Sequence, residues 1–160
     1  MAKFSPCGNY RFQLERTINT VSDRAILFIM SNPSTATAEV DDKTTEIICE
    51  IAKKWNYGKV YAGNIYPNCP HKTRSLPDDI KKENKKYIEE MIQSVHTVVY
   101  AWGSKGPRGN KEVEPEWLKE IMKGEPYCIG KSAKGIPKHA YQWGDWRKNI
   151  PDRPIPFHLP

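Results

Sequence analysis

The spacing of apolar residues along the chain changes repeatedly between strand-like and helix-like. Residues 10–16 alternate apolar and polar side chains, which predicts a half-buried strand. The run Ala25-Ile-Leu-Phe-Ile-Met30 is continuously apolar, as in a strand buried on both faces. Further inner strands are predicted over residues 59–66, 97–102 and 126–130.

Segments whose apolar residues have helical spacing lie between these strands. The first predicted helix has one apolar face, made of Ile47, Ile48, Ile51, Ala52 and Trp55. Asp41 and Asp42 precede it, where carboxylates suit a helix N-terminus, and Gly58 is expected to end it. Two more helices are predicted over residues 77–94 and 115–122.

Strands that alternate with helices predict an α/β fold, a single-domain three-layer sandwich with a mainly parallel central sheet of about four strands. The domain is expected over residues 1–150. Residues 151–160 contain four prolines and are expected to form an extended tail on the surface. Ligands of such sheets bind at the carboxyl ends of the strands. The loops expected to converge there are 31–42, 64–76, 103–110 and 131–139.

Composition narrows the possible partners. The 160 residues carry a net charge of +6 with a pI near 9.1, so a polyanionic partner such as DNA or RNA is plausible. The longest apolar run, residues 25–30, is too short to span a bilayer, and no signal-peptide stretch begins the sequence. We therefore expect a cytoplasmic protein without a membrane partner.

The four cysteines lack the paired spacing of a zinc site and are expected to be free thiols. The turn at residues 31–35 follows a buried strand, and its N–H and hydroxyl groups could hold a phosphate or a water, although a helix cap explains them equally. Asp41 and Asp42 could bind a metal or act as a base, but helix N-terminal placement also accounts for them.

Other candidate residues lie at predicted strand ends or in basic loops. Asn64 could read a base edge and Tyr66 could stack on a base, and His139 could act as a general acid or an electrostatic partner. Candidates for base or ligand binding are Ser31, Pro33, Ser34, Thr35, Asn64, Tyr66, Trp102 and Gly103. Candidates for nucleic-acid contact are Arg74, Lys131, Lys134, Lys138 and Arg147.

Six segments, in order, resemble a bacterial and phage family known only as domain of unknown function 1643. The segments are Ser5–Arg11, Phe28–Thr35, Asp41–Thr44, Trp55–Gly58, Ala101–Gly103 and Gly130–His139. A more distant similarity joins Ile26–Pro33 and Asn64–Pro77 to the uracil-DNA glycosylase superfamily. Two departures weaken that similarity: Pro70 directly follows Cys69, and Ala140-Tyr141 stands where the superfamily usually has Pro-Ser.

The glycosylase resemblance implies a uracil-DNA glycosylase-like fold and three roles: Asn32 positions the attacking water, Asn64 reads the base edge, and His139 stabilises the leaving base. With Asp42 included as a possible catalytic acid or base, the expected function is hydrolysis of the N-glycosidic bond of a modified or damaged base in DNA. No cofactor or metal is implied. Two alternatives stay open: a non-catalytic protein that binds a nucleotide or modified base in phage–host conflict, and a metal-dependent nuclease built on Asp41 and Asp42.

Overall fold

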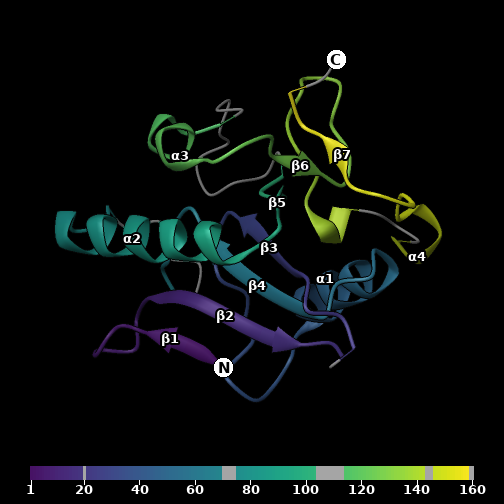
Figure 1. Ribbon diagram of the computed structural model, residues 1–160. Helices are drawn as coiled ribbons and strands as arrows, with labels where there is room; N and C mark the ends of the chain where they lie inside the picture. The colour runs from purple at the N-terminus through teal and green to yellow at the C-terminus, as the bar shows by residue number, and fades with distance from the viewer. Residues whose placement is uncertain (20, 70–74, 104–113, 143–145, 159–160) are drawn as a thin grey trace.

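The computed structural model describes residues 1–19, 21–69, 75–103, 114–142 and 146–158, which form a seven-stranded sheet with helices on both faces (Figure 1). Across the sheet, the strands are β1 (Ala2–Phe4), β2 (Arg11–Thr17), β4 (Lys59–Asn64), β3 (Ala25–Met30), β5 (Thr97–Tyr100), β6 (Tyr127–Cys128) and β7 (Ile155–Pro156). The helices are α1 (Lys43–Lys54), α2 (Asp78–Ser94), α3 (Glu116–Ile121) and α4 (Trp146–Asn149), with a 3-10 turn η1 at Ala140–Gln142.

The centre of the sheet is parallel and its borders are antiparallel. β3 pairs in parallel with β4 and β5, and β5 pairs in parallel with β6. β1, β2 and β7 each pair antiparallel with their neighbours. The expected α/β fold with a parallel centre is confirmed, whereas the sheet as a whole is mixed. The sequence did not predict β1 or β7, because strands of two or three residues show too little alternation to be recognised.

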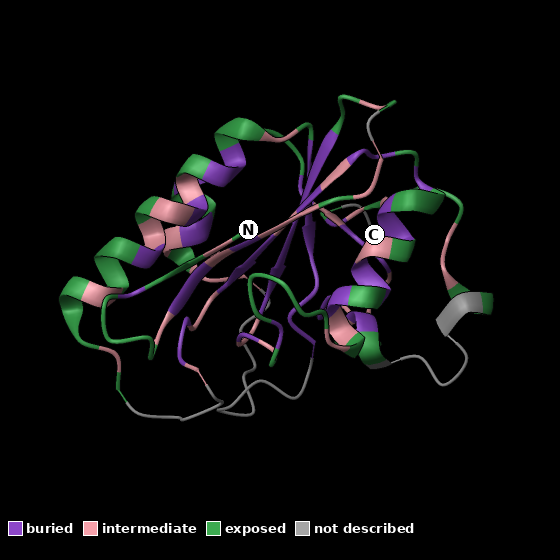
Figure 2. Ribbon diagram, turned by 90° about the horizontal axis from the view of Figure 1, so that it is seen from below, coloured by how far each residue is buried: buried purple, intermediate pink, exposed green. Residues whose placement is uncertain are grey.

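Two apolar layers lie on opposite faces of the sheet. Phe28 of β3 packs in the cluster that includes Ile48 of α1, and the next residue, Ile29, packs in the cluster that includes Ile88 of α2. This alternation is the period of two that a strand imposes on its side chains. Figure 2 shows the buried strands running between helices that turn their own buried sides inward. No helix in the described ranges is long and apolar enough to cross a membrane.

Several predicted boundaries were wrong by a few residues. Helix α1 ends at Lys54, before the predicted end at Gly58, and the residue with a left-handed φ after it is Asn56, at 60°. β4 ends at Asn64 and β5 at Tyr100, two residues before the predicted ends. Ala101 and Trp102, which follow β5, are as buried as the strand itself, so an apolar run does not mark where the strand ends.

The proline-rich end of the chain is extended, as expected, but it joins the sheet. Ile155–Pro156 forms β7 beside β6, and the backbone N–H of Phe157 donates to the carbonyl of Pro126 at 2.8 Å. The Phe157 ring is buried against Tyr100 and Trp102, with centroid separations of 5.2 and 6.3 Å. The tail therefore contributes to the core on the α2 face rather than lying only on the surface.

Gly58 is needed for close approach of two backbone segments. A Cβ added there would lie 1.9 Å from the backbone oxygen of Ser22. We expect Gly58→Ala to lower the free energy of unfolding by about 3 kcal/mol, measured by urea denaturation, because the clash can be relieved only by moving backbone. Gly124→Ala is the control: its φ is +79° and no atom lies within 4 Å of the added Cβ, so only about 1 kcal/mol of backbone preference is lost. Equal losses in the two variants would contradict the prediction.

Candidate functional site

The loops that follow the parallel strands meet at one edge of the sheet. The backbone N–H of Tyr66, after β4, donates to the carbonyl of Ser31, after β3, at 2.9 Å. The N–H of Gly103, after β5, donates to the carbonyl of Pro137, after β6, at 3.0 Å. β2 runs in the opposite direction to β4, so its first residue, Arg11, begins at this same edge. We call this region the strand-end site.

Asn64 is the last residue of β4 and is 1% exposed. It follows Ala62 by two positions, so its side chain faces the α1 side of the sheet, where Ala62 packs. Its side-chain Oδ1 and Nδ2 have no hydrogen-bond partner among the described residues. A buried amide with both groups unpaired costs free energy and is suited to a ligand that offers one donor and one acceptor.

Asn32 and His139 lie at the same edge as Asn64. Asn32 is half-buried in the loop after β3, and its Oδ1 accepts a hydrogen bond from the Ser31 hydroxyl at 3.2 Å. His139 is half-buried before η1, and its Nδ1 accepts from the backbone N–H of Tyr141 at 3.0 Å. Burial lowers the pKa of His139 below its ordinary value, so the ring is neutral at pH 7 and its Nε2 carries the proton.

Asp42 has a structural role as the N-cap of α1. Its Oδ1 accepts from the backbone N–H and the hydroxyl of Thr45 at 2.9 and 3.0 Å, and its Oδ2 accepts from the N–H of Ala36 at 3.0 Å and the hydroxyl of Thr35 at 3.4 Å. Burial alone would raise the pKa of Asp42, but the neighbouring Ser34 side chain and the hydrogen bonds from Thr45 and Ala36 lower it below its ordinary value. Four donors therefore occupy the carboxylate that the sequence offered as catalytic.

Asp41 does not share a site with Asp42. Its Oδ1 pairs with Nε of Arg16 at 2.6 Å at the surface. The two adjacent acids thus serve separate contacts, and no group of three His, Cys, Asp or Glu side chains that could hold a metal ion occurs among the residues described. All four cysteines are free, as expected.

Arg11 was not a candidate in the sequence and is the least expected residue at this edge. It is 1% exposed, and its Nη1 donates to the carbonyls of Ala36 at 2.8 Å and Ser34 at 3.4 Å. It therefore fixes the backbone of the turn that Asp42 also holds, whose Pro33 is buried. An arginine in an alternating strand is expected to face solvent, so the sequence carries no signal that would have revealed this burial.

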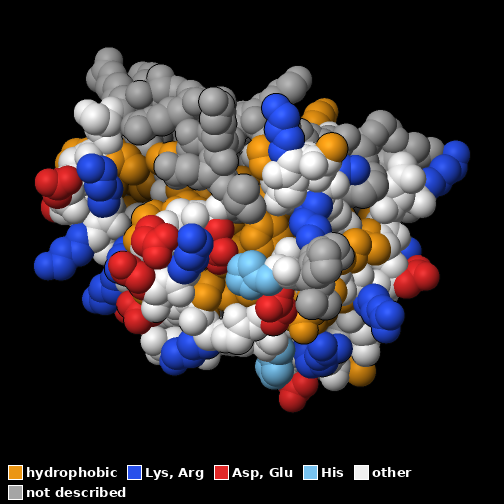
Figure 3. Space-filling view, turned by 90° about the horizontal axis from the view of Figure 1, so that it is seen from above, with side chains coloured by type: hydrophobic (Ala, Val, Ile, Leu, Met, Phe, Trp, Pro, Cys, Tyr) orange, Lys and Arg blue, Asp and Glu red, His pale blue; other side chains and the backbone are white. Residues whose placement is uncertain are grey.

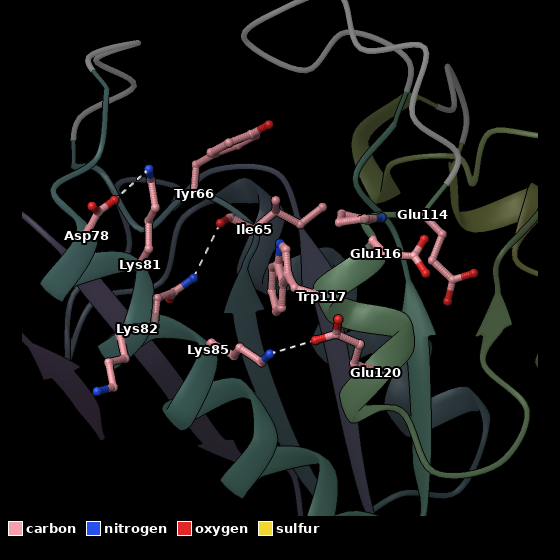
Figure 4. A pocket seen from close by; sticks show the side chains of 12 residues that line it. Ile65, Tyr66, Asp78, Lys81, Lys82, Lys85, Glu114, Glu116, Trp117 and Glu120 are labelled. Carbon is pink, nitrogen blue, oxygen red and sulfur yellow. Dashed lines mark hydrogen bonds and ion pairs between the residues drawn. The ribbon is translucent and has the colours of Figure 1, made fainter.

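Trp102 and Tyr66 were also predicted to contact the ligand. Trp102 belongs to the cluster on the α2 face, with its ring 4.5 Å from that of Tyr100, and its indole Nε1 is buried without a hydrogen-bond partner among the described residues. Tyr66 lines a cleft of about 980 Å³ between α2 and α3 (Figure 4). Trp102 therefore packs on the face of the sheet opposite to the Asn64 side chain.

The α2–α3 cleft has charged walls and aromatic side chains. Lys85 of α2 and Glu120 of α3 form an ion pair at 2.9 Å across it, and Trp117 lies near them (Figure 4). Asn84, on α2, donates from Nδ2 to the backbone carbonyl of Asn64 at 2.9 Å. Asn84 thus contacts the backbone of Asn64 from the cleft, but it does not contact the Asn64 side chain.

The expected basic surface is only partly described. Nζ of Lys131 donates to the carbonyl of Phe157 at 3.1 Å, so this lysine holds the C-terminal segment. Lys134 is exposed and Lys138 is half-buried. Arg74 and the side chain of Arg147, whose backbone is in α4, lie outside the described residues. On the face shown in Figure 3, basic and acidic side chains are interspersed.

We expect Asp42→Ala to lower the free energy of unfolding by about 1–2 kcal/mol at pH 7, because the N-cap of α1 is lost. The pKa of Asp42 is lowered on folding, so its contribution is complete above the unfolded-state pKa of about 4 and is lost as the pH falls through the folded-state value. Urea denaturation from pH 7 to pH 2 should show the wild-type and variant curves converging in acid. Asp41→Ala, at a surface ion pair, should cost less than about 1 kcal/mol. A larger loss for Asp41→Ala than for Asp42→Ala would contradict this assignment.

The comparisons with known proteins give a family and no activity. No curated protein and no solved structure matches the chain. The uracil-DNA glycosylase resemblance therefore still depends on the sequence motifs alone. One family model, described as a protein of unknown function (DUF1643), matches residues 11–140, from the buried Arg11 through His139 to η1. The chain belongs to the DUF1643 family.

Proposed function

We propose that the protein recognises a nucleobase at the strand-end site and hydrolyses the N-glycosidic bond of a modified or damaged base. The single observation that carries the proposal is the buried Asn64 amide, whose oxygen and nitrogen both lack partners among the described residues. A base edge presents donors and acceptors side by side, and an asparagine amide pairs with such an edge in two hydrogen bonds.

The reaction would need few groups. Asn32 would orient a water whose oxygen bonds to the sugar C1′ while the bond from C1′ to the base nitrogen breaks. The departing base takes the bonding electrons, and the water releases a proton to solvent or to the base. His139 would donate a hydrogen bond from Nε2–H to the base as negative charge develops on it. The neutral ring that burial favours fits a hydrogen-bond donor rather than an ion-pair partner.

The direct test is base release from single- and double-stranded oligonucleotides that carry a panel of modified bases. Strand breaks after alkali, resolved on a gel with and without chelator, would report N-glycosidic cleavage. Asn32→Ala and His139→Ala should each slow release by about a hundredfold or more, because both residues act on charge in the transition state. Selective binding without release would favour the alternative of a binding protein. If the protein neither binds nor releases any base in the panel, the proposal is contradicted.

Replacing Asn64 with leucine separates function from stability. Leucine has a similar size and removes two unpaired buried groups, so Asn64→Leu should raise the free energy of unfolding by about 1 kcal/mol while removing base recognition. Asn84→Leu is the matched control, because its Nδ2 is hydrogen-bonded to the Asn64 carbonyl and its loss should destabilise the fold. Thermal denaturation and the oligonucleotide assay measure the two effects. An Asn64→Leu variant that is less stable yet fully active would show that the amide is structural.

A further inference from the structure

The guanidinium of Arg11 has one edge occupied and one edge unpaired. Nη1 donates to two backbone carbonyls, those of Ser34 and Ala36. Nε and Nη2 are buried and have no hydrogen-bond partner among the described residues. These two nitrogens form the side-on edge of an arginine, whose parallel N–H groups match two oxygens of a carboxylate or a phosphate.

The guanidinium of Arg11 also lacks a direct ion-pair partner among the described residues. No carboxylate lies within ion-pair distance of it in the part of the chain that the structure describes. Burial lowers the pKa of the guanidinium, although Asp42 and Cys69 nearby act in the opposite direction. A buried cation without a direct ion-pair partner is costly, and a bound anion would lower the cost of both the charge and the two unpaired donors.

Arg16, on the same strand, is an arginine whose three guanidinium nitrogens each have a hydrogen-bond partner. Its Nε pairs with Asp41 at 2.6 Å, and its Nη1 and Nη2 donate to the carbonyls of Glu15 at 2.9 Å and Thr37 at 2.6 Å. Both arginines hold the same loop, residues 34–37, through backbone carbonyls. An arginine can therefore anchor that loop with all of its nitrogens paired. Arg11 differs from Arg16 because its Nε and Nη2 stay unpaired among the described residues.

We propose that Arg11 is an oxyanion-binding residue whose Nε and Nη2 hold a phosphate or carboxylate group of a ligand at the strand-end site. The inference stands without the base-recognition function, since it depends only on Arg11 and its surroundings. If both hold, the ligand is a nucleotide whose phosphate contacts Arg11 and whose base contacts Asn64. The Arg11 nitrogens are covered in this structure, so anion binding requires the groups that cover them to move.

The test uses the full chain with inorganic phosphate and, separately, with acetate as the probes. Chloride at matched ionic strength serves as the reference. Two readouts are followed as the anion is titrated: the melting temperature and the shift of the arginine Nε–H resonances in a proton–nitrogen correlation spectrum. We expect a saturable rise in melting temperature with one of the two probes, and a shift of the Arg11 resonance while that of Arg16 stays in place.

Two variants identify the residue responsible. Arg11→Lys keeps the charge but loses the side-on pair, and should weaken anion binding about tenfold or more. Arg16→Lys is the matched control and should bind the anion as the wild type does. If Arg11→Lys does not fold, the anion-dependent shift of the Arg11 Nε–H resonance in the wild-type chain still tests the proposal. The proposal is overturned if phosphate and acetate act no differently from chloride, or if Arg11→Lys binds the anion as tightly as the wild type. Failure of base release in the oligonucleotide assay would leave this result unaffected.

Discussion

Parallel pairing of β3 with both β4 and β5 is the constraint on which the rest of the structure depends. All six residues of β3 are buried, so both of its faces must be covered, and α1 and α2 take opposite sides. Parallel strands also end at the same edge, which gathers the loops carrying Asn32, Asn64 and His139. The antiparallel return of β2 adds Arg11 to that edge.

The strand-end site concentrates polar groups that folding alone does not justify. Asn64 and Arg11 are each 1% exposed and together leave four side-chain atoms unpaired among the described residues: Oδ1 and Nδ2 of Asn64, and Nε and Nη2 of Arg11. Asp42, by contrast, has four donors and acts as a cap. Unpaired buried polar groups are expected at sites that bind a ligand, because the ligand supplies the missing partners.

Elements with strong periodicity were predictable, and short or context-dependent ones were not. The apolar run 25–30 is β3 to the residue, and the helix predicted over 77–94 is α2 within one residue. β7 was not recognised, because its two residues, one of them a proline, carry no alternation and pair only when β6 lies beside them. The sequence did not show which face Trp102 takes: its ring packs on the α2 side of the sheet, because successive residues of an extended chain point to opposite faces.

The sequence by itself determined the α/β class, the inner strands, and the loops in which Asn32, Asn64 and His139 lie, because periodicity and turn residues are local properties. Only the tertiary structure decided which polar side chains are buried and which of them are satisfied. The burial of Arg11 follows from β2 running antiparallel to β4 and from the loop 34–36 folding back over it. Burial and hydrogen-bond pairing depend on segments far apart in the chain, and no local pattern records them.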